Sequence, residues 1–140
     1  MQNKEIRKRR RIFLALSLLW MAVIFYFSGQ TGTESGTASG FFAEIFGLPD
    51  WIIRKGAHVA EYAVLGFLLK GFFDCLPLKK TYFYAWGISV LYAASDELHQ
   101  MFSAGRTPAV RDVCIDAAGA ALGVGFMCLV TAVRCKRKVL

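Results

Sequence analysis

The chain has 140 residues, of which 56% are hydrophobic, and it carries a formal net charge of +7. Its mean hydropathy is +0.43. A soluble protein of this size would have difficulty burying so much apolar surface, because soluble domains are usually less apolar. The length fits a single domain. The composition therefore argues against a soluble protein and favours a small membrane protein.

Basic residues gather near the two ends of the chain, between residues 4 and 11 and between residues 134 and 138. Such runs can bind nucleic acid or anionic lipid. Because each run adjoins an apolar segment, we interpret both as topology determinants in contact with membrane lipids, and we expect no nucleic-acid partner. The four cysteines show no Cys-x-x-Cys spacing. The sequence therefore supports neither a disulfide framework nor a zinc–thiolate site.

Four apolar segments follow one another, at about residues 12–28, 57–73, 81–100 and 113–133. Each approaches the roughly 20 residues that cross a bilayer as a helix. The first and fourth are convincing by apolar length alone. The second and third require that their polar ends be buried in protein or lie among lipid headgroups. The prediction is an all-α, integral membrane four-helix bundle that forms one domain over residues 1–140.

Charge predicts the orientation of this bundle. The basic N-terminus is expected in the cytoplasm, and four crossings return the basic C-terminus to the same side. The turn at residues 74–80 then faces the cytoplasm, whereas residues 29–56 and the loop around Gly105 lie outside. A cleaved signal peptide is the main alternative for the first segment. Its apolar core is long and no Ala-x-Ala pattern follows closely, so we expect a retained helix.

The connection between the first two segments is rich in Gly, Ser and Thr from Gly29 to Gly40, which is typical of a loop. Ser39 or Thr37 could then cap a short amphipathic helix over the apolar side chains of Phe41, Phe42, Ile45 and Phe46. Such a helix would lie in the membrane interface. The bundle is therefore expected with or without a short interfacial helix between its first two transmembrane helices.

Polar side chains recur at helical spacing at one end of the second, third and fourth segments. Residues three, four and seven apart share a helix face, and the predicted orientation brings all three polar ends to the same outer level. A charged group inside a bilayer costs about 3 kcal/mol on insertion scales, so such groups are tolerated where they meet one another or water. The candidate site comprises Lys55, His58, Glu61, Asp96, Glu97, His99, Gln100, Arg106, Arg111, Asp112 and Asp116.

The fourth segment also carries Gly119 and Gly123 on the face that continues from Asp112 and Asp116. This GxxxG spacing permits close contact between helices. The spacing is common in helices rich in alanine and glycine, and its coincidence with the acidic pair strengthens the signal.

Three uses of the polar cluster remain open. The first is structural, with Arg106 or Arg111 pairing with an acidic side chain to lock the helices. The second is binding of a divalent metal ion, with the candidate ligands His58, Glu61, Asp96 and His99. The third is acid–base or phosphate chemistry, in which these same four residues transfer protons. A substrate would then be bound by Lys55, Glu97, Gln100, Arg106, Arg111, Asp112 and Asp116, with the cations holding a phosphate or carboxylate.

From about Ser28 to Gly123 the chain resembles the VanZ-like family of small bacterial membrane proteins. The strings that carry the resemblance are Ser28-x-Gln30, Arg54-Lys55-x-x-His58-x-x-Glu61-Tyr62-x-x-Leu65-Gly66, Ser95-Asp96-Glu97-Leu98-His99-Gln100-x-Phe102-x-x-Gly105-Arg106 and Asp112-Val113-x-x-Asp116-x-x-Gly119. Ser103-Ala104 departs mildly from the Pro-Gly-Arg that members often show at this loop. The resemblance implies a multi-pass protein of the bacterial cytoplasmic (inner) membrane, a role in the cell envelope and an influence on susceptibility to the glycopeptide teicoplanin. It supplies no agreed reaction.

The residues and the resemblance together predict an outward-facing polar site that binds or modifies an anionic envelope component. A lipid-linked envelope precursor or a glycopeptide is the expected kind of partner. The alternative is a non-enzymatic accessory or binding protein whose polar cluster only ties the helices together. Whether the protein is an enzyme stays open.

Overall fold

The computed structural model describes residues 2–30, 32–102 and 109–137. In these residues the chain forms five helices and no strand, which confirms the predicted all-α class. The helices are α1 (Gln2–Ser28), α2 (Gly32–Phe46), α3 (Asp50–Phe73), α4 (Thr81–Gln100) and α5 (Val110–Arg137).

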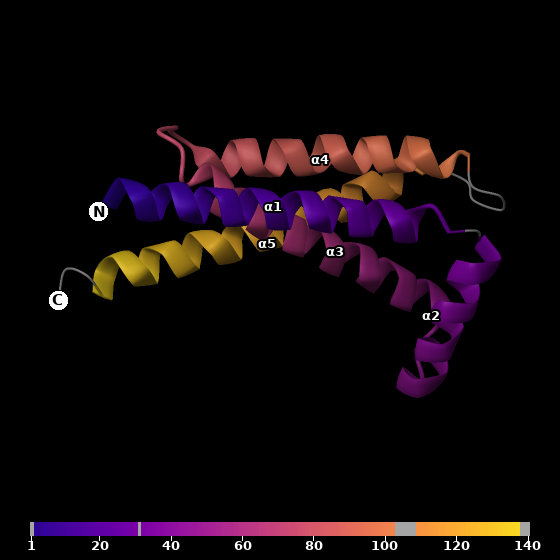
Figure 1. Ribbon diagram of the computed structural model, residues 1–140. Coiled ribbons are helices and arrows are strands. Elements are labelled where there is room, and N and C mark those ends of the chain that lie inside the picture. Colours follow the sequence, from indigo (N-terminus) through magenta and orange to yellow (C-terminus); the bar gives the residue numbers. More distant parts are fainter. Residues whose placement is uncertain (1, 31, 103–108, 138–140) are drawn as a thin grey trace.

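Four of the helices, α1, α3, α4 and α5, run roughly along one direction, while α2 lies across one end of them (Figure 1). α3 is the central helix, because it contacts each of the other four. The two termini and the turn between α3 and α4 lie at the left of Figure 1. The opposite end holds α2, the start of α3, the end of α4 and the start of α5, and we call it the far end.

Several helices end at the same residue as the predicted apolar segment. Others extend beyond that segment into polar residues. α3 ends at Phe73 and α4 spans residues 81–100, as the apolar segments do. However, α3 begins at Asp50, seven residues before its apolar segment. Pro49 precedes it, and Asp50 in the first turn suits the helix dipole and pairs with Arg54 at 2.9 Å. A helix continues through polar residues because its backbone hydrogen bonds do not depend on apolar side chains.

The prediction of a loop over residues 29–40 was wrong, because α2 begins at Gly32. Ser39 was also wrong as a cap, since its buried hydroxyl donates to the carbonyl oxygen of Gly36 inside the helix, at 3.3 Å. Relative to alanine, glycine and serine each disfavour a helix by at most about 1 kcal/mol per residue, which tertiary contacts can outweigh. α2 packs against α3, so its helical state depends on a contact outside the segment itself.

The turn between α3 and α4 is held by a charged group that is almost fully buried. Lys70 is 5% exposed, and its ammonium group lies 2.6 Å from both carboxylate oxygens of Asp74. The Thr81 hydroxyl, in the first turn of α4, donates to the same carboxylate. These contacts link the end of α3 to the start of α4 and help to fold α4 back along α3.

Glycine allows α3 and α5 to approach each other closely. A Cβ atom on Gly119 would lie 2.5 Å from the carbonyl oxygen of Val59, and one on Gly123 would collide with the backbone of Ala63. From the other side, Gly66 of α3 lies against the backbone of Ala120. The close contact expected from the GxxxG spacing is therefore present, and it sets the rotation of α5 against α3.

Large apolar side chains point away from the core on several helices. Leu19 of α1 is 63% exposed, Leu91 of α4 is 71% exposed and Leu122 of α5 is 66% exposed. Among the described helices, α1 over Asn3–Ser28 and α5 over Val110–Lys136 are long and apolar enough to cross a membrane. An apolar outer surface of this extent is typical of a protein that is surrounded by lipid.

Candidate functional site

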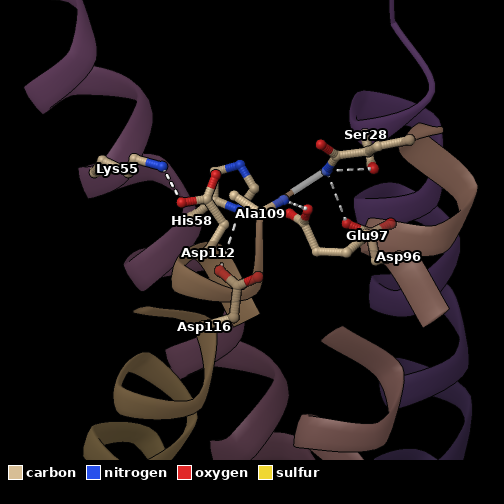
Figure 2. Close-up of polar contacts among 9 residues, drawn as sticks. Ser28, Lys55, His58, Asp96, Glu97, Ala109, Asp112 and Asp116 are labelled. Atoms are coloured by element: carbon tan, nitrogen blue, oxygen red, sulfur yellow. Dashed lines mark hydrogen bonds and ion pairs between the residues drawn. The ribbon is translucent and has the colours of Figure 1, made fainter. Parts of the chain in front are cut away.

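The far end brings polar side chains of α3 and α5 into direct contact. The ammonium group of Lys55 donates to the carboxylate of Asp112, and His58 Nδ1 lies 3.1 Å from Asp116 Oδ1 (Figure 2). Asp116 is fully buried, whereas Lys55 and Asp112 are partly exposed. Both pairs form because Lys55 and His58 lie about one turn apart on α3, as Asp112 and Asp116 do on α5.

A second group of contacts joins α4 to α1 and to the start of α5. The Gln100 amide donates to Ser28 Oγ at 3.0 Å and lies 3.4 Å from Asp96 Oδ2. The backbone N–H of Ala109 donates to Glu97 Oε2 at 2.9 Å. Figure 2 shows these contacts beside those of Lys55 with Asp112 and of His58 with Asp116. The polar end of the third apolar segment is therefore enclosed by protein, as its composition requires.

The two groups are close enough to interact electrostatically. The carboxylate of Asp96 interacts with both His58 and Asp116. The carboxylate of Glu97 interacts with Asp112 and Asp116 as well as with His58. Acidic groups from α4 and α5 thus share one region of the far end with His58 of α3.

The two histidines have different surroundings. The His99 ring stacks on Phe25 of α1, with ring centroids 4.0 Å apart and an interplanar angle of 24°. Its Nδ1 is buried and has no hydrogen-bond partner in the described residues. In the same residues, no group of three or more His, Cys, Asp and Glu side chains is arranged to hold a metal ion. The geometry therefore does not support a metal site built from His58, Glu61, Asp96 and His99.

A cavity of about 260 Å³ opens beside His58. Glu61 is also on its wall, and the backbone carbonyl of Glu61 accepts a hydrogen bond from Trp20 Nε1 at 2.8 Å. The wall combines polar and apolar side chains from α1, α2, α3 and the residues between them: Phe27, Ser28, Gln30, Ser39, Phe42, Ile53, Arg54, Ala57, His58 and Glu61. Such a mixed lining suits a ligand with one polar and one apolar part.

Of the predicted cations, Arg111 takes no part in these contacts among the described residues. Arg106 lies outside the described residues. Arg111 is described, but its side chain is exposed and forms no ion pair with another described residue. Among the described residues, Lys55 rather than Arg111 pairs with Asp112, and the predicted pairing of Arg106 stays a prediction.

Sequence reasoning missed part of the cavity wall. Arg54 shares a helix face with His58 and Glu61, at spacings of four and seven residues, and this pattern could have added it to the site. Phe42 and Ser39 could not have been found this way, because their place on the wall depends on α2 folding back against α3. Tyr62, which is fully buried, was also left out of the predicted site.

These features define a small, all-helical membrane protein with a buried polar cluster and a mixed cavity at one end. The chain matches the VanZ/LLP1 family model over residues 13–131, and it belongs to this family. The resemblance to the VanZ-like family is therefore confirmed. No curated protein and no solved structure matched the chain.

Proposed function

We propose that α1, α3, α4 and α5 each cross the bacterial cytoplasmic membrane, with both termini in the cytoplasm and the far end outside. The basic residues near the termini favour this orientation. The exposed Leu91 in the middle of α4 is suited to lipid. α3 needs less apolar surface than a lone transmembrane helix, because the other helices surround much of it.

The orientation of α2 supports its assignment as an interfacial helix. It lies across the end of the bundle rather than along it (Figure 1). Its exposed side chains include Phe41, Phe42, Ile45 and Phe46. Aromatic and aliphatic side chains on such a helix enter the boundary between headgroups and acyl chains. In this arrangement the cavity opens at the level of the outer headgroups.

The far-end cavity binds the headgroup of an anionic amphiphile of the cell envelope, such as a lipid-linked phosphate. One observation carries this proposal: His58, oriented by the buried Asp116, lies on the wall of a cavity whose other side chains include Phe27, Phe42 and Ile53. The aromatic and aliphatic side chains suit the lipid chain, and the polar ones suit the headgroup.

Arg54 supplies a positive charge on the cavity wall. It pairs with Asp50, but both side chains are well exposed, and such a pair contributes little free energy, typically below about 1 kcal/mol. Arg54 can therefore exchange Asp50 for a phosphate at small cost. Lys55 is less available, because it is bound to Asp112.

His58 is the group best suited to move a proton at a bound headgroup. A buried carboxylate that holds one ring nitrogen of a histidine leaves the other ring nitrogen to exchange a proton with a ligand. The pair of His58 and Asp116 has this arrangement, and His58 also lines the cavity. Any modification of the ligand is expected to depend on this histidine.

Binding of a polyprenyl phosphate to the purified protein in neutral detergent tests the proposal, with native mass spectrometry as the measurement. The phosphate should bind more tightly than the uncharged polyprenol. Arg54→Gln should weaken phosphate binding about tenfold, the effect of losing one charge-assisted contact of roughly 1.4 kcal/mol. Arg111→Gln is the matched control, because Arg111 does not line the cavity. Equal binding of the two lipids would contradict the preference for an anion.

The family extends the proposal to glycopeptide susceptibility. Cells that express the wild-type chain should tolerate teicoplanin better than cells that express His58→Ala at equal protein level. Growth at graded teicoplanin concentrations measures this difference. Identical tolerance of the two strains would separate the binding site from any resistance role.

The alternative function is that of an accessory protein whose polar cluster is structural. It is favoured by one observation: the contacts of Lys55 with Asp112 and of Gln100 with Ser28 each join two different helices. In that case substitutions in the cluster should lower stability while polyprenyl phosphate binding, measured on the folded fraction, stays unchanged.

A further inference from the structure

An apolar groove lies between α4 and α5, and it shares no lining residue with the cavity beside His58. Its volume is about 410 Å³. None of its lining residues is charged, which suits a hydrocarbon chain. The residues that line the groove are Tyr82, Phe83 and Trp86 of α4 and Ala121, Val124, Gly125 and Cys128 of α5.

The packing of the two helices leaves this groove open. A Cβ atom on Gly125 would meet nothing within 4 Å, so the glycine leaves space in the wall. The indole N–H of Trp86 donates to the carbonyl oxygen of Ala117 at 3.0 Å and links α4 to α5 beside the groove. Trp86 is still 38% exposed, so part of its side chain remains available to a ligand.

Positive charge lies at one end of the groove. Tyr82 and Phe83 are in the first turn of α4, at the end of the bundle that holds both termini (Figure 1). Lys79 and Lys80 directly precede this turn and are exposed. The backbone N–H of Phe83 donates to the carbonyl oxygen of Lys80 at 2.9 Å, so Lys80 lies one turn from the groove wall. A ligand with an anionic head at these lysines could therefore place an apolar tail in the groove.

α5 adds cations toward the same end. Cys135 continues the helix face of Ala121 and Cys128, because these three residues are seven apart. Arg134 and Lys136 flank Cys135 and are exposed. These two cations and the two lysines before α4 form no ion pair with another described residue. Both helices that line the groove therefore carry cations available to an anion.

The backbone of Lys80 is held in an unfavourable conformation. Its φ is 55° and its ψ is 42°, which is the left-handed region. This conformation costs a residue with a Cβ atom about 1–2 kcal/mol, whereas glycine adopts it readily. Strained residues of this kind cluster at ligand sites. A lysine at this position supplies what a glycine would not, namely a positive charge beside the groove.

We propose that this groove binds an anionic phospholipid of the surrounding bilayer, with one acyl chain between α4 and α5 and the phosphate beside Lys79 and Lys80. Basic pockets between transmembrane helices are typical sites for such headgroups. A second copy of the chain fits less well, because in the same membrane orientation its own cations would lie at the same level and repel these. The site is separate from the far-end cavity and does not depend on ligand binding there.

Quenching of tryptophan fluorescence tests the position of the acyl chain, in the full chain purified in neutral detergent. The probe is phosphatidylglycerol brominated on its acyl chains, and brominated phosphatidylcholine is the zwitterionic comparison. Each protein is measured with and without Trp86→Phe, so that the difference isolates the quenching of Trp86 from that of Trp20 and Trp51. Phosphatidylglycerol should reach half-maximal quenching at about a tenfold lower concentration than phosphatidylcholine.

Two double substitutions test the charges. Lys79→Gln with Lys80→Gln should lower the affinity for phosphatidylglycerol to near that for phosphatidylcholine. Lys4→Gln with Lys8→Gln is the matched control, because it removes the same charge from α1, which does not line the groove. This control should keep the preference for phosphatidylglycerol. An equal loss in both proteins would show only a general attraction to a basic surface and would overturn the proposal.

Three single substitutions separate binding from folding. Lys80→Gly relieves the left-handed strain, so the melting temperature without lipid should not fall, while the affinity for phosphatidylglycerol should. Gly125→Leu should fill the groove and weaken the binding of both lipids. Gly87→Leu is its control, because it adds the same side chain where nothing lies within 4 Å and outside the groove. It should bind both lipids as the wild type does, and a loss equal to that of Gly125→Leu would contradict the site.

Three further outcomes would overturn the proposal. The first is equal quenching of Trp86 by the two lipids. The second is loss of this quenching in Arg54→Gln, which would place the lipid in the far-end cavity. The third is a dimer in native mass spectrometry together with no quenching of Trp86, which would place a second copy in the groove.

Discussion

His58 Nδ1 lies 3.1 Å from Asp116 Oδ1, in a contact that joins α3 to α5 inside the far end of the bundle. The carboxylate is fully buried, while the imidazole has 18% of its side chain exposed and lines the cavity. The buried Asp116 therefore fixes the orientation of the partly exposed His58 ring. This asymmetry makes His58 the member of the pair that can meet a ligand and Asp116 the member that orients it.

Replacement of His58 should show how much this contact stabilises the bundle. His58→Ala leaves Asp116 without its imidazole partner, and loss of a buried hydrogen bond costs about 1–3 kcal/mol. His58→Gln keeps a hydrogen-bond donor and should recover part of the loss. Thermal unfolding in detergent measures both variants. Equal melting temperatures for wild type and His58→Ala would mean that the contact contributes nothing to stability.

The pair of Lys55 and Asp112 predicts rescue by exchange of charges. Lys55→Asp places two carboxylates together and should lower stability by about 1 kcal/mol, as should Asp112→Lys with two ammonium groups. The double exchange restores opposite charges and should recover most of the loss. Denaturation of all four proteins in the same detergent gives the coupling free energy. Strictly additive effects would show that the two side chains do not interact.

Two glycines of α5, Gly123 and Gly125, provide a matched pair of substitutions that test the close contact between α3 and α5. Gly123→Ala should cost about 1–3 kcal/mol, because its Cβ would collide with the backbone of Ala63, which cannot move without shifting α3. Gly125→Ala adds the same atom where nothing lies within 4 Å. It should be neutral or slightly stabilising, since alanine favours helix over glycine. Thermal unfolding compares the two, and similar losses would argue against the close contact.

Cysteine labelling tests the proposed orientation. The exposed Cys135, near the C-terminus, should react with a membrane-impermeant maleimide only after cells are opened. Cys75 should react more slowly than Cys135 from the same side, because burial raises the pKa of its thiol and leaves less thiolate. Phe102→Cys replaces a side chain that is 88% exposed, two residues beyond the end of α4. It should label in intact cells, and protection there would refute an outward far end.

The sequence was sufficient for the helices because their signals are local. Apolar runs between charged or proline-containing turns marked where α1, α3, α4 and α5 lie, and the ends at Phe73 and Gln100 agree with the structure. α2 was only half foreseen, as a short helix over residues 41–46, because glycine and serine in its first part favour a loop when considered alone. Its contact with α3 is not visible in its own residues.

Pairings within the site were harder to predict. Spacing on one helix correctly grouped Lys55 with His58 and Asp112 with Asp116, because a helix repeats every 3.6 residues. Spacing cannot state which group of one helix meets which group of another. The sequence therefore left Arg106 or Arg111 as the expected partner of Asp112, Asp96 or Glu61, and among the described residues the partner of Asp112 is Lys55. The sequence also grouped His99 with His58 as candidate metal ligands or proton-transfer groups, whereas in the structure the His99 ring stacks on Phe25.

The amino-acid sequence by itself determined the family, the helical class and the kinds of side chain available at the polar ends of the helices, since each of these depends on residue identity and short-range spacing. Only the tertiary structure decided that Asp116 faces His58, that Tyr62 is fully buried, and that α2 completes a cavity. These relationships depend on the rotation of α5 against α3. Backbone contact at Gly66, Gly119 and Gly123 sets that rotation, and contacts between distant segments have no signature in any one of them.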